Sequence, residues 1–153
     1  MQIKVKTIRN LEVIEKELNS ITAGVFLLSK NDDYFQFASS FVYYNTNIYF
    51  FIQDTDTTKN IELNSKARFI AIKEKGLAGK SADKDNIIYT VTSISVNGVL
   101  KRVEENKIKN NIKQSFIQKY SGKFIESGLK SKSFKKLFYI DSEELLAIEE
   151  TGS

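Results

Sequence analysis

Residues 38–53, ASSFVYYNTNIYFFIQ, and residues 57–72, TTKNIELNSKARFIAI, form the stretch that decides the fold. From residue 34 to 44, one set of alternate positions holds Phe35, Phe37, Ser39, Phe41 and Tyr43, and the other set includes Gln36, Ala38, Ser40 and Val42. This alternation predicts a strand between two environments. Asn45-Thr46-Asn47 has residue types that are typical of a turn, so residues 48–52 should form the second strand of a hairpin. We expect a short helix over residues 56–64 and another strand over residues 67–73.

The rest of the chain contains further strands and two helical patterns. Apolar residues at helical spacing predict helices over residues 7–21 and 105–120. Strands are expected over residues 23–29, 87–103, 137–140 and 145–148, with a bend at Asn97-Gly98, a polar loop at 76–86 and a frayed tail at 149–153. Strands that are mostly joined by tight turns favour an antiparallel barrel or a highly curved sheet over a parallel fold.

Composition restricts the chemistry that the chain can perform. The 153 residues include no Cys, His, Trp or Pro, which excludes a disulfide framework, a Ser-His-Asp triad and a thiolate or imidazole metal site. We therefore expect no metal, and an enzyme of this composition would borrow a cofactor. No stretch is apolar enough to span a membrane and residues 1–10 are too charged for a signal peptide, so we expect a soluble, cytoplasmic protein.

Positive charge is concentrated in one segment. Residues 101–136 carry 11 basic and 3 acidic side chains, which is typical of a solvated helical face. The less favoured alternative is a nucleic-acid-binding module, in which aromatic side chains lie among the lysines. Its residues would be Lys107, Lys109, Lys113, Lys119, Lys123, Lys130, Lys132, Lys135 and Lys136 with Phe116, Tyr120, Phe124 and Phe134.

Thr57, Thr58 and Lys59 stand where the short helix is expected to begin. They are consistent with a simple N-cap, in which Asp56 or Thr57 accepts hydrogen bonds from free backbone N–H groups. They are also consistent with a phosphate site, because hydroxyls, an ammonium and backbone donors meet there. In the preceding strand, Ser39 and Ser40 interrupt the aromatic residues and would let a flat ring approach the backbone.

The order of these elements resembles the pyridoxamine 5′-phosphate oxidase-like FMN-binding split-barrel superfamily. The resemblance covers roughly residues 8–149 and is best to a small, poorly characterised branch with a lysine-rich helical insertion. The later stretch VTSISVNGVLKRVEE is similar to the superfamily's long strand with a central glycine, here Gly98. The matching residues are Phe41-Val42-Tyr43 with Ile48-Tyr49-Phe50, the turn Thr57-Thr58-Lys59, Leu63 and Arg68-Phe69.

The resemblance implies a mainly β (α+β) fold. The expected architecture is a six-stranded antiparallel split β-barrel with an N-terminal helix and a helical insertion before the last strands. Residues 1–153 would form a single domain whose ends, 1–6 and 150–153, are flexible. The superfamily also implies a homodimer with FMN in a groove between the protomers.

Site residues follow from the same resemblance, position by position. Phosphate contacts fall on Thr57, Thr58 and Lys59, and flavin-ring contacts fall on Phe37, Ala38, Ser39, Ser40, Ile52 and Gln53. Phe37 stands where many members have an arginine, so fewer cations than usual would meet the phosphate.

The function implied is that of an FMN-dependent oxidoreductase, with a substrate and catalytic residues that the sequence does not name. The alternative is a non-catalytic protein that binds a flavin, a deazaflavin or a haem-type ligand.

Overall fold

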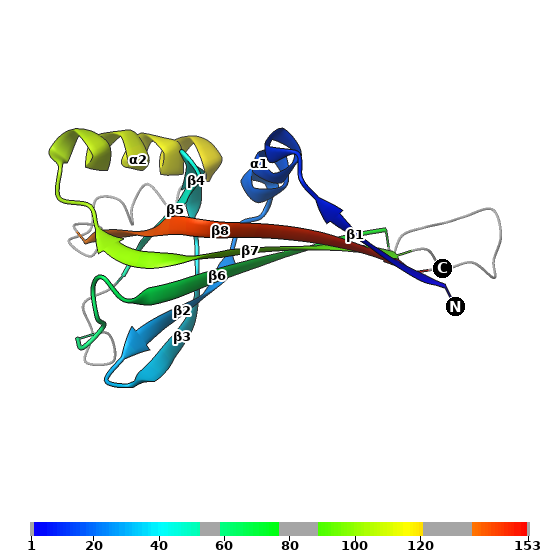
Figure 1. Ribbon diagram of the computed structural model, residues 1–153. Coiled ribbons are helices and arrows are strands. Elements are labelled where there is room, and N and C mark those ends of the chain that lie inside the picture. Colours follow the sequence, from blue (N-terminus) through cyan, green and yellow to red (C-terminus); the bar gives the residue numbers. More distant parts are fainter. Residues whose placement is uncertain (1, 53–58, 77–88, 121–135, 153) are drawn as a thin grey trace.

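The computed structural model describes residues 2–52, 59–76, 89–120 and 136–152. These residues form one antiparallel sheet and two helices (Figure 1). The strands run in the order β3-β2-β6-β7-β8-β5-β4, and β1 pairs with β8. In chain order the elements are β1 (Ile3–Ile8), α1 (Leu11–Ser20), β2 (Gly24–Lys30), β3 (Asp33–Ser39), β4 (Val42–Tyr44), β5 (Asn47–Phe51), β6 (Lys66–Lys75), β7 (Tyr89–Arg102), α2 (Asn106–Lys119) and β8 (Leu137–Gly152).

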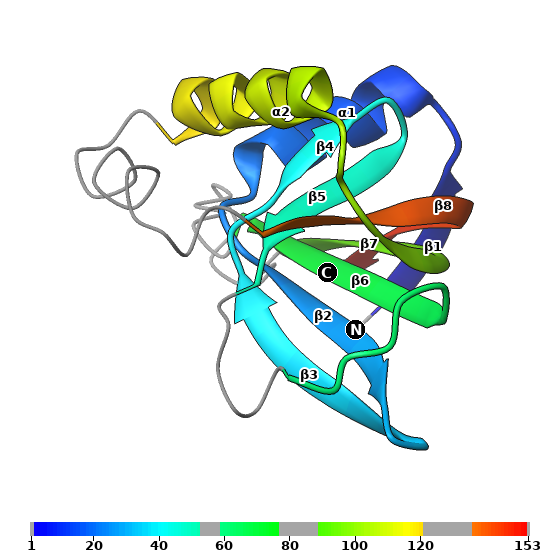
Figure 2. The same cartoon turned by 90° about the vertical axis from the view of Figure 1, so that its left-hand side faces the viewer.

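The sheet is strongly curled, and both helices lie on the same side of it (Figures 1 and 2). Phe26 on β2, Phe69 on β6 and Phe50 on β5 are fully buried inside the curl. Ile14 and Leu18 of α1 belong to the same apolar cluster. A second cluster joins α2 to the sheet through Ile112, Phe116, Val42, Tyr49, Val103 and Leu137. The described residues therefore form a mainly β half-barrel, which agrees with the split-barrel expectation.

Two tight turns set the register of the hairpins. Asn31 and Asp32 both have positive φ, as do Asn45 and Thr46. Two positive φ values in a two-residue loop are the mark of a type I′ turn, whose twist matches that of the flanking strands. The hairpin predicted around Asn45-Thr46-Asn47 is confirmed by the pairing of β4 with β5, but the single strand expected over residues 34–44 is divided into β3 and β4. The turn at Asn31 and Asp32 joins β2 to β3.

The predicted bend at Asn97-Gly98 is a β-bulge. The pairing of β7 with β8 shifts between these two residues. A Cβ added at Gly98 would lie 2.0 Å from the backbone oxygen of Asp141. Glycine is therefore required here because the two backbones approach each other too closely for a side chain.

The strand number is corrected by the structure. The described residues hold eight strands rather than six. Residues 3–6 and 150–152, expected as flexible ends, lie in the paired strands β1 and β8. The two short strands expected at 137–140 and 145–148 are one continuous strand, β8, which also contains most of the expected frayed tail. Strand β1 is stabilised by its pairing with β8, and the end of β8 pairs with both β1 and β7. These partners are distant in sequence, so local patterns do not predict the order of these segments.

The helices also differ from their predicted bounds. Helix α1 begins later than residue 7 because Asn10 is its N-cap, with the side-chain oxygen accepting a hydrogen bond from the Glu12 N–H. The helix expected over residues 56–64 is wrong for its described part. There the chain makes turns, and Ile61 forms an isolated bridge with Lys30. In the described part, Asn60 and Asn64 are suited to turns, and Asn64 has a positive φ.

Some predictions fall on residues outside the described ranges. These are Gln53, Thr57 and Thr58, nearly all of the polar loop at 76–86, and the lysine-rich residues 123, 130, 132 and 135 with Phe124 and Phe134. Within the described part of the chain, neither helix has the length and apolar character needed to cross a membrane.

Candidate functional site

Strand β3 is an edge of the sheet and carries three of the predicted ring-contact residues. Of the described strands, it pairs only with β2. The register runs from Lys30 opposite Asp33 to Gly24 opposite Ser39. After a two-residue turn, hydrogen-bonded and non-hydrogen-bonded pairs alternate, which makes Val25–Ala38 a non-hydrogen-bonded pair. The backbone N–H and C=O of Ala38 therefore point to the outer edge of β3, where a ligand can reach them.

Ala38 itself is exposed and small. A small side chain lets a planar ring approach the strand edge closely. The next two residues, Ser39 and Ser40, are half-buried, and the Ser39 hydroxyl donates to the Ser40 carbonyl oxygen at 3.0 Å. The end of β3 thus combines backbone groups at an open edge with two hydroxyls, which is a suitable surface for a heteroaromatic ring.

The residue that follows the two serines is held by α2. Phe41 is fully buried, and its backbone N–H donates to the Tyr120 hydroxyl at 2.9 Å. The carbonyl oxygens of Thr22 and Phe41 both lie 2.9 Å from this hydroxyl, and its single proton is shared between them. Burial raises the pKa of Tyr120 to about 12, so the hydroxyl keeps its proton at neutral pH. Helix α2 therefore fixes the corner between β3 and β4.

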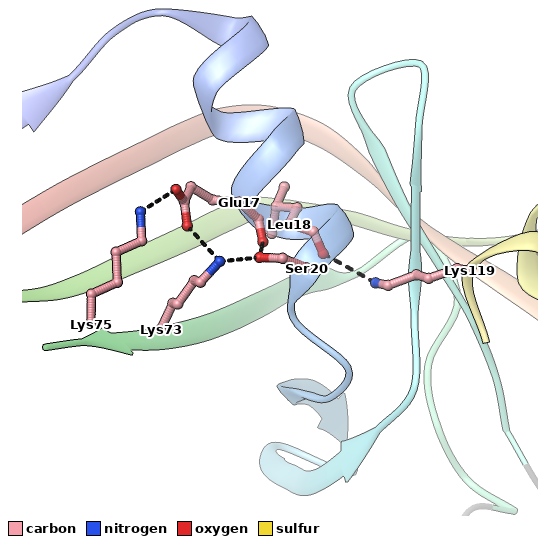
Figure 3. A network of polar contacts seen from close by, with 6 residues as sticks. All are labelled: Glu17, Leu18, Ser20, Lys73, Lys75 and Lys119. Carbon is pink, nitrogen blue, oxygen red and sulfur yellow. Dashed lines mark hydrogen bonds and ion pairs between the residues drawn. The ribbon is translucent and has the colours of Figure 1, made fainter. Parts of the chain in front are cut away.

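Lys119 makes the second connection to this corner. Its Nζ donates to the carbonyl oxygen of Phe41 at 3.0 Å and to that of Leu18, near the end of α1, at 3.1 Å. Figure 3 shows the side chain reaching from α2 toward α1. Burial lowers the pKa of Lys119 to about 7. The sequence analysis counted Lys119 among the lysines of a charged segment, and no local signal distinguishes it from its solvated neighbours.

Two of the predicted ring contacts, Phe37 and Ile52, belong to or pack against the apolar core. The ring of Phe37 stacks on Phe26 at a centroid distance of 5.4 Å and packs against the core cluster. Ile52 is buried in the same cluster. Phe116 and Tyr120, the described aromatic residues of the nucleic-acid hypothesis, stack on each other at 5.8 Å in the interior of the protein.

Lys59 is exposed, and the chain after it is attached to the turn of the β2–β3 hairpin. The Glu62 N–H donates to the Ser29 carbonyl oxygen at 3.1 Å, and the Asn31 N–H donates to Glu62 Oε1 at 3.0 Å. Ser39 lies at the opposite end of the hairpin. No described contact joins Lys59 to the serine pair, so their convergence on one ligand stays a prediction.

A network of ion pairs and hydrogen bonds connects α1 to β6. Glu17 is buried between Lys73 and Lys75, and Lys73 also donates to the Ser20 hydroxyl (Figure 3). Burial raises the pKa of the Glu17 carboxyl, but the two lysines outweigh burial and the net shift is downward. The carboxylate therefore stays charged, and the network holds α1 in place over the sheet.

The outer face of the sheet carries an open groove of about 390 Å³. Arg68 on β6 lies opposite Asn97 on β7, which lies opposite Glu144 on β8, so the groove has a basic side and an acidic side. Beside it lie two exposed apolar residues, Ile72 at 59% and Leu146 at 37%. A sheet face with charges of opposite sign around apolar residues has the character of an interaction surface.

The described residues contain no group of three or more carboxylates that could hold a metal ion. In sequence, no protein-family model and no curated protein matches the chain.

Solved structures match it over nearly its whole length. An FAD-binding protein from Mesorhizobium loti has a TM-score of 0.67 and 13% identity, covering 99% of this chain and 100% of its own. A protein provisionally named a pyridoxamine 5′-phosphate oxidase, from Corynebacterium glutamicum, has a TM-score of 0.59 and 16% identity, with 95% and 98% covered. HutZ, the haem storage protein of Vibrio cholerae, has a TM-score of 0.63 and 15% identity, with 90% and 94% covered.

These likenesses define the class of fold. The chain has the split-barrel fold of the pyridoxamine 5′-phosphate oxidase-like flavin-binding proteins. The resemblance stated from the hairpin and the Gly98 strand is therefore confirmed at the level of the fold.

The connection between α2 and the β3–β4 corner gives a testable prediction. Replacing Tyr120 with Phe leaves the buried N–H of Phe41 without an acceptor, and we expect a loss of about 1–3 kcal/mol in the free energy of unfolding. Urea denaturation followed by circular dichroism measures this loss. The control is Tyr44→Phe, at a ring that is 41% exposed, where the change should be within about 0.5 kcal/mol. Equal effects at both tyrosines would show that Tyr120 does not hold the corner.

Proposed function

We propose that this chain binds FMN along the outer edge of β3 and acts as a flavin-dependent oxidoreductase. The observation that carries the proposal is the full-length likeness to a structure described as FAD-binding, which covers 99% of this chain. The residues at the edge are suited to the ligand. Ala38 offers backbone N–H and C=O groups, and Ser39 and Ser40 offer hydroxyls, to the heteroatoms of a planar ring.

The cofactor would supply the hydride and electron chemistry, for which the chain has no group of its own. The part of this chain is to bind, to orient and to exclude water. Phe37 packs against the core and so supports β3 from the inner face of the sheet. Lys59 would supply a cation to the phosphate. With one described lysine in this role and Phe37 where many members have an arginine, we expect a modest affinity for FMN.

Lys59 allows a direct test of the phosphate contact. A charge-assisted contact to phosphate contributes about 1.5–3 kcal/mol, so Lys59→Ala should weaken FMN binding by roughly 10- to 100-fold. Quenching of flavin fluorescence during titration measures the affinity. Because Lys59 is exposed, the unfolding midpoint of the variant should be unchanged.

The matched control is Lys4→Ala, which removes an exposed lysine from β1. Its FMN affinity should equal that of the parent protein. Equal affinities for all three proteins would remove Lys59 from the site.

We propose further that the protein is a homodimer formed by the outer sheet face. In a two-fold dimer the same patch meets itself, so β6 of one protomer would face β8 of the other. Arg68 would then lie against Glu144 of the partner subunit, while Ile72 and Leu146 are buried between them. The superfamily resemblance, which implies a dimer with a cofactor groove between the protomers, supports this proposal.

A charge reversal tests this arrangement. Arg68→Glu creates repulsion between like charges at both symmetry-related contacts, and we expect the dimer to weaken by at least about tenfold. The double variant Arg68→Glu, Glu144→Arg restores opposite charges and should recover the dimer, as measured by sedimentation equilibrium. Arg102→Glu, at an exposed position on the same sheet, is the control. A monomeric parent protein, or no rescue, would contradict the proposed face.

A second candidate is a carrier that binds a flavin, a deazaflavin or a haem-type ligand without turnover. The likeness to the haem storage protein HutZ favours it. Steady-state oxidation of NADH or NADPH by the FMN-loaded protein separates the two. Turnover that is faster than that of free FMN is expected for the oxidoreductase, whereas bound flavin with no turnover would support the carrier.

A further inference from the structure

The peptide group between Ser40 and Phe41 connects the end of the proposed flavin edge to α2. The side chain of Phe41 is fully buried, and its backbone N–H donates to the Tyr120 hydroxyl at 2.9 Å. A peptide group is planar and trans, so its N–H and its C=O point in opposite directions. The hydrogen bond to Tyr120 therefore also fixes the direction in which the carbonyl group of Ser40 points.

The carbonyl group of Ser40 in turn orients the hydroxyl of Ser39. The two oxygens are 3.0 Å apart, and because a carbonyl oxygen can only accept, the Ser39 hydroxyl donates its single proton to it. The hydroxyl oxygen can still accept hydrogen bonds, and Ser39 is only half-buried, so a ligand at the edge of β3 can reach it. The Ser39 side chain thus offers a ligand an acceptor and no donor.

Tyr120 is itself held in place by contacts outside β3. It is the C-cap residue of α2, and its N–H donates to the Phe116 carbonyl oxygen at 2.9 Å. Its ring stacks on that of Phe116 at a centroid distance of 5.8 Å. Its hydroxyl lies 2.9 Å from the carbonyl oxygens of both Thr22 and Phe41. The position of this hydroxyl therefore does not depend on β3.

A flavin ring has the donor that matches this arrangement. The oxidised isoalloxazine ring carries a single N–H, on the imide nitrogen between two carbonyl groups, and its other heteroatoms accept hydrogen bonds. At the edge of β3, the Ala38 N–H supplies a donor for a carbonyl oxygen of the imide. The acceptor on the next residue, Ser39, suits the imide N–H. A Ser39 hydroxyl turned to donate its proton outward would leave that N–H without this partner, which costs binding energy.

We propose that Tyr120 is a positioning residue for the flavin ring that acts through the backbone of Phe41. It commits the Ser39 proton to the Ser40 carbonyl oxygen, and Ser39 then accepts a hydrogen bond from the imide N–H of the flavin. This inference rests on the proposed function, because it requires a flavin at the edge of β3. It adds a determinant of specificity, since a ring without an N–H at this place loses the bond to Ser39.

A double-mutant cycle on FMN affinity tests the connection between Tyr120 and Ser39. Loss of one hydrogen bond weakens binding by about 3- to 10-fold, and we expect this loss in Ser39→Ala and in Tyr120→Phe. The double variant should bind no more weakly than the weaker single variant, because both substitutions remove the same bond. Effects that multiply would overturn the proposal. Tyr44→Phe, at an exposed ring, is the control and should keep the parent affinity.

An FMN analogue gives a readout that a loss of stability does not change. FMN methylated at the imide nitrogen has no N–H to donate, so the parent protein should bind it about 3- to 10-fold more weakly than FMN. Ser39→Ala should bind the two compounds equally, and Tyr120→Phe should discriminate between them less than the parent does. Unchanged discrimination in Ser39→Ala would overturn the proposal, and this arm does not depend on the folding of Tyr120→Phe.

NMR spectra of the protein without FMN separate failure of this proposal from failure of the proposed function. Tyr120→Phe should lose the protection of the Phe41 amide from hydrogen exchange and shift the amide signals of Ser39 and Ser40. Tyr44→Phe should leave all three unchanged. Unchanged Ser39 and Ser40 signals in Tyr120→Phe would overturn the positioning role. A parent protein that shows these shifts in the variant but binds no FMN would contradict the proposed function and support only the orientation of Ser39 by Tyr120.

Discussion

The structure depends on a contact across the inside of the curled sheet. Phe26 on β2 and Phe50 on β5 belong to strands that are not neighbours in the sheet, yet their ring centroids are 4.0 Å apart. Phe37 on the edge strand β3 also approaches Phe50, at 6.0 Å. Burying each such ring stabilises the fold by about 2–3 kcal/mol, and aromatic pairing adds to this. This contact keeps the sheet curled and so determines where the edge of β3 lies.

Helix α2 extends this arrangement to the surface. Its last turn supplies Lys119 and Tyr120, which bind the backbone of Phe41 and reach the end of α1. The corner between β3 and β4 is thus fixed by aromatic packing on one side and by polar contacts on the other. The serine pair at the end of β3 lies directly before this corner in the chain. A helix inserted late in the sequence therefore positions residues that come about 80 positions earlier in the chain.

Much of the fold could be predicted because its signals are local. The Asn and Asp residues at positions 31, 32 and 45 tolerate the positive φ of type I′ turns, and Gly98 allows the close approach at the bulge. Strand β1 was missed since its residues alternate between exposed lysines and largely exposed apolar side chains, and only the distant β8 stabilises it. The position of Lys119 could not be predicted either. Its partners are 78 and 101 residues away, and its burial exists only after α1, β4 and α2 have packed together.

The central claim, a flavin on the outer edge of β3, is tested most directly by following backbone amide signals in NMR spectra during an FMN titration. The account predicts that the amides of Ala38, Ser39 and Ser40 shift progressively and saturate at one FMN per chain. The amide of Ala38 should shift strongly because its N–H points to the open edge. Saturable binding that leaves these three amides unchanged, or no binding at millimolar FMN, would contradict the account.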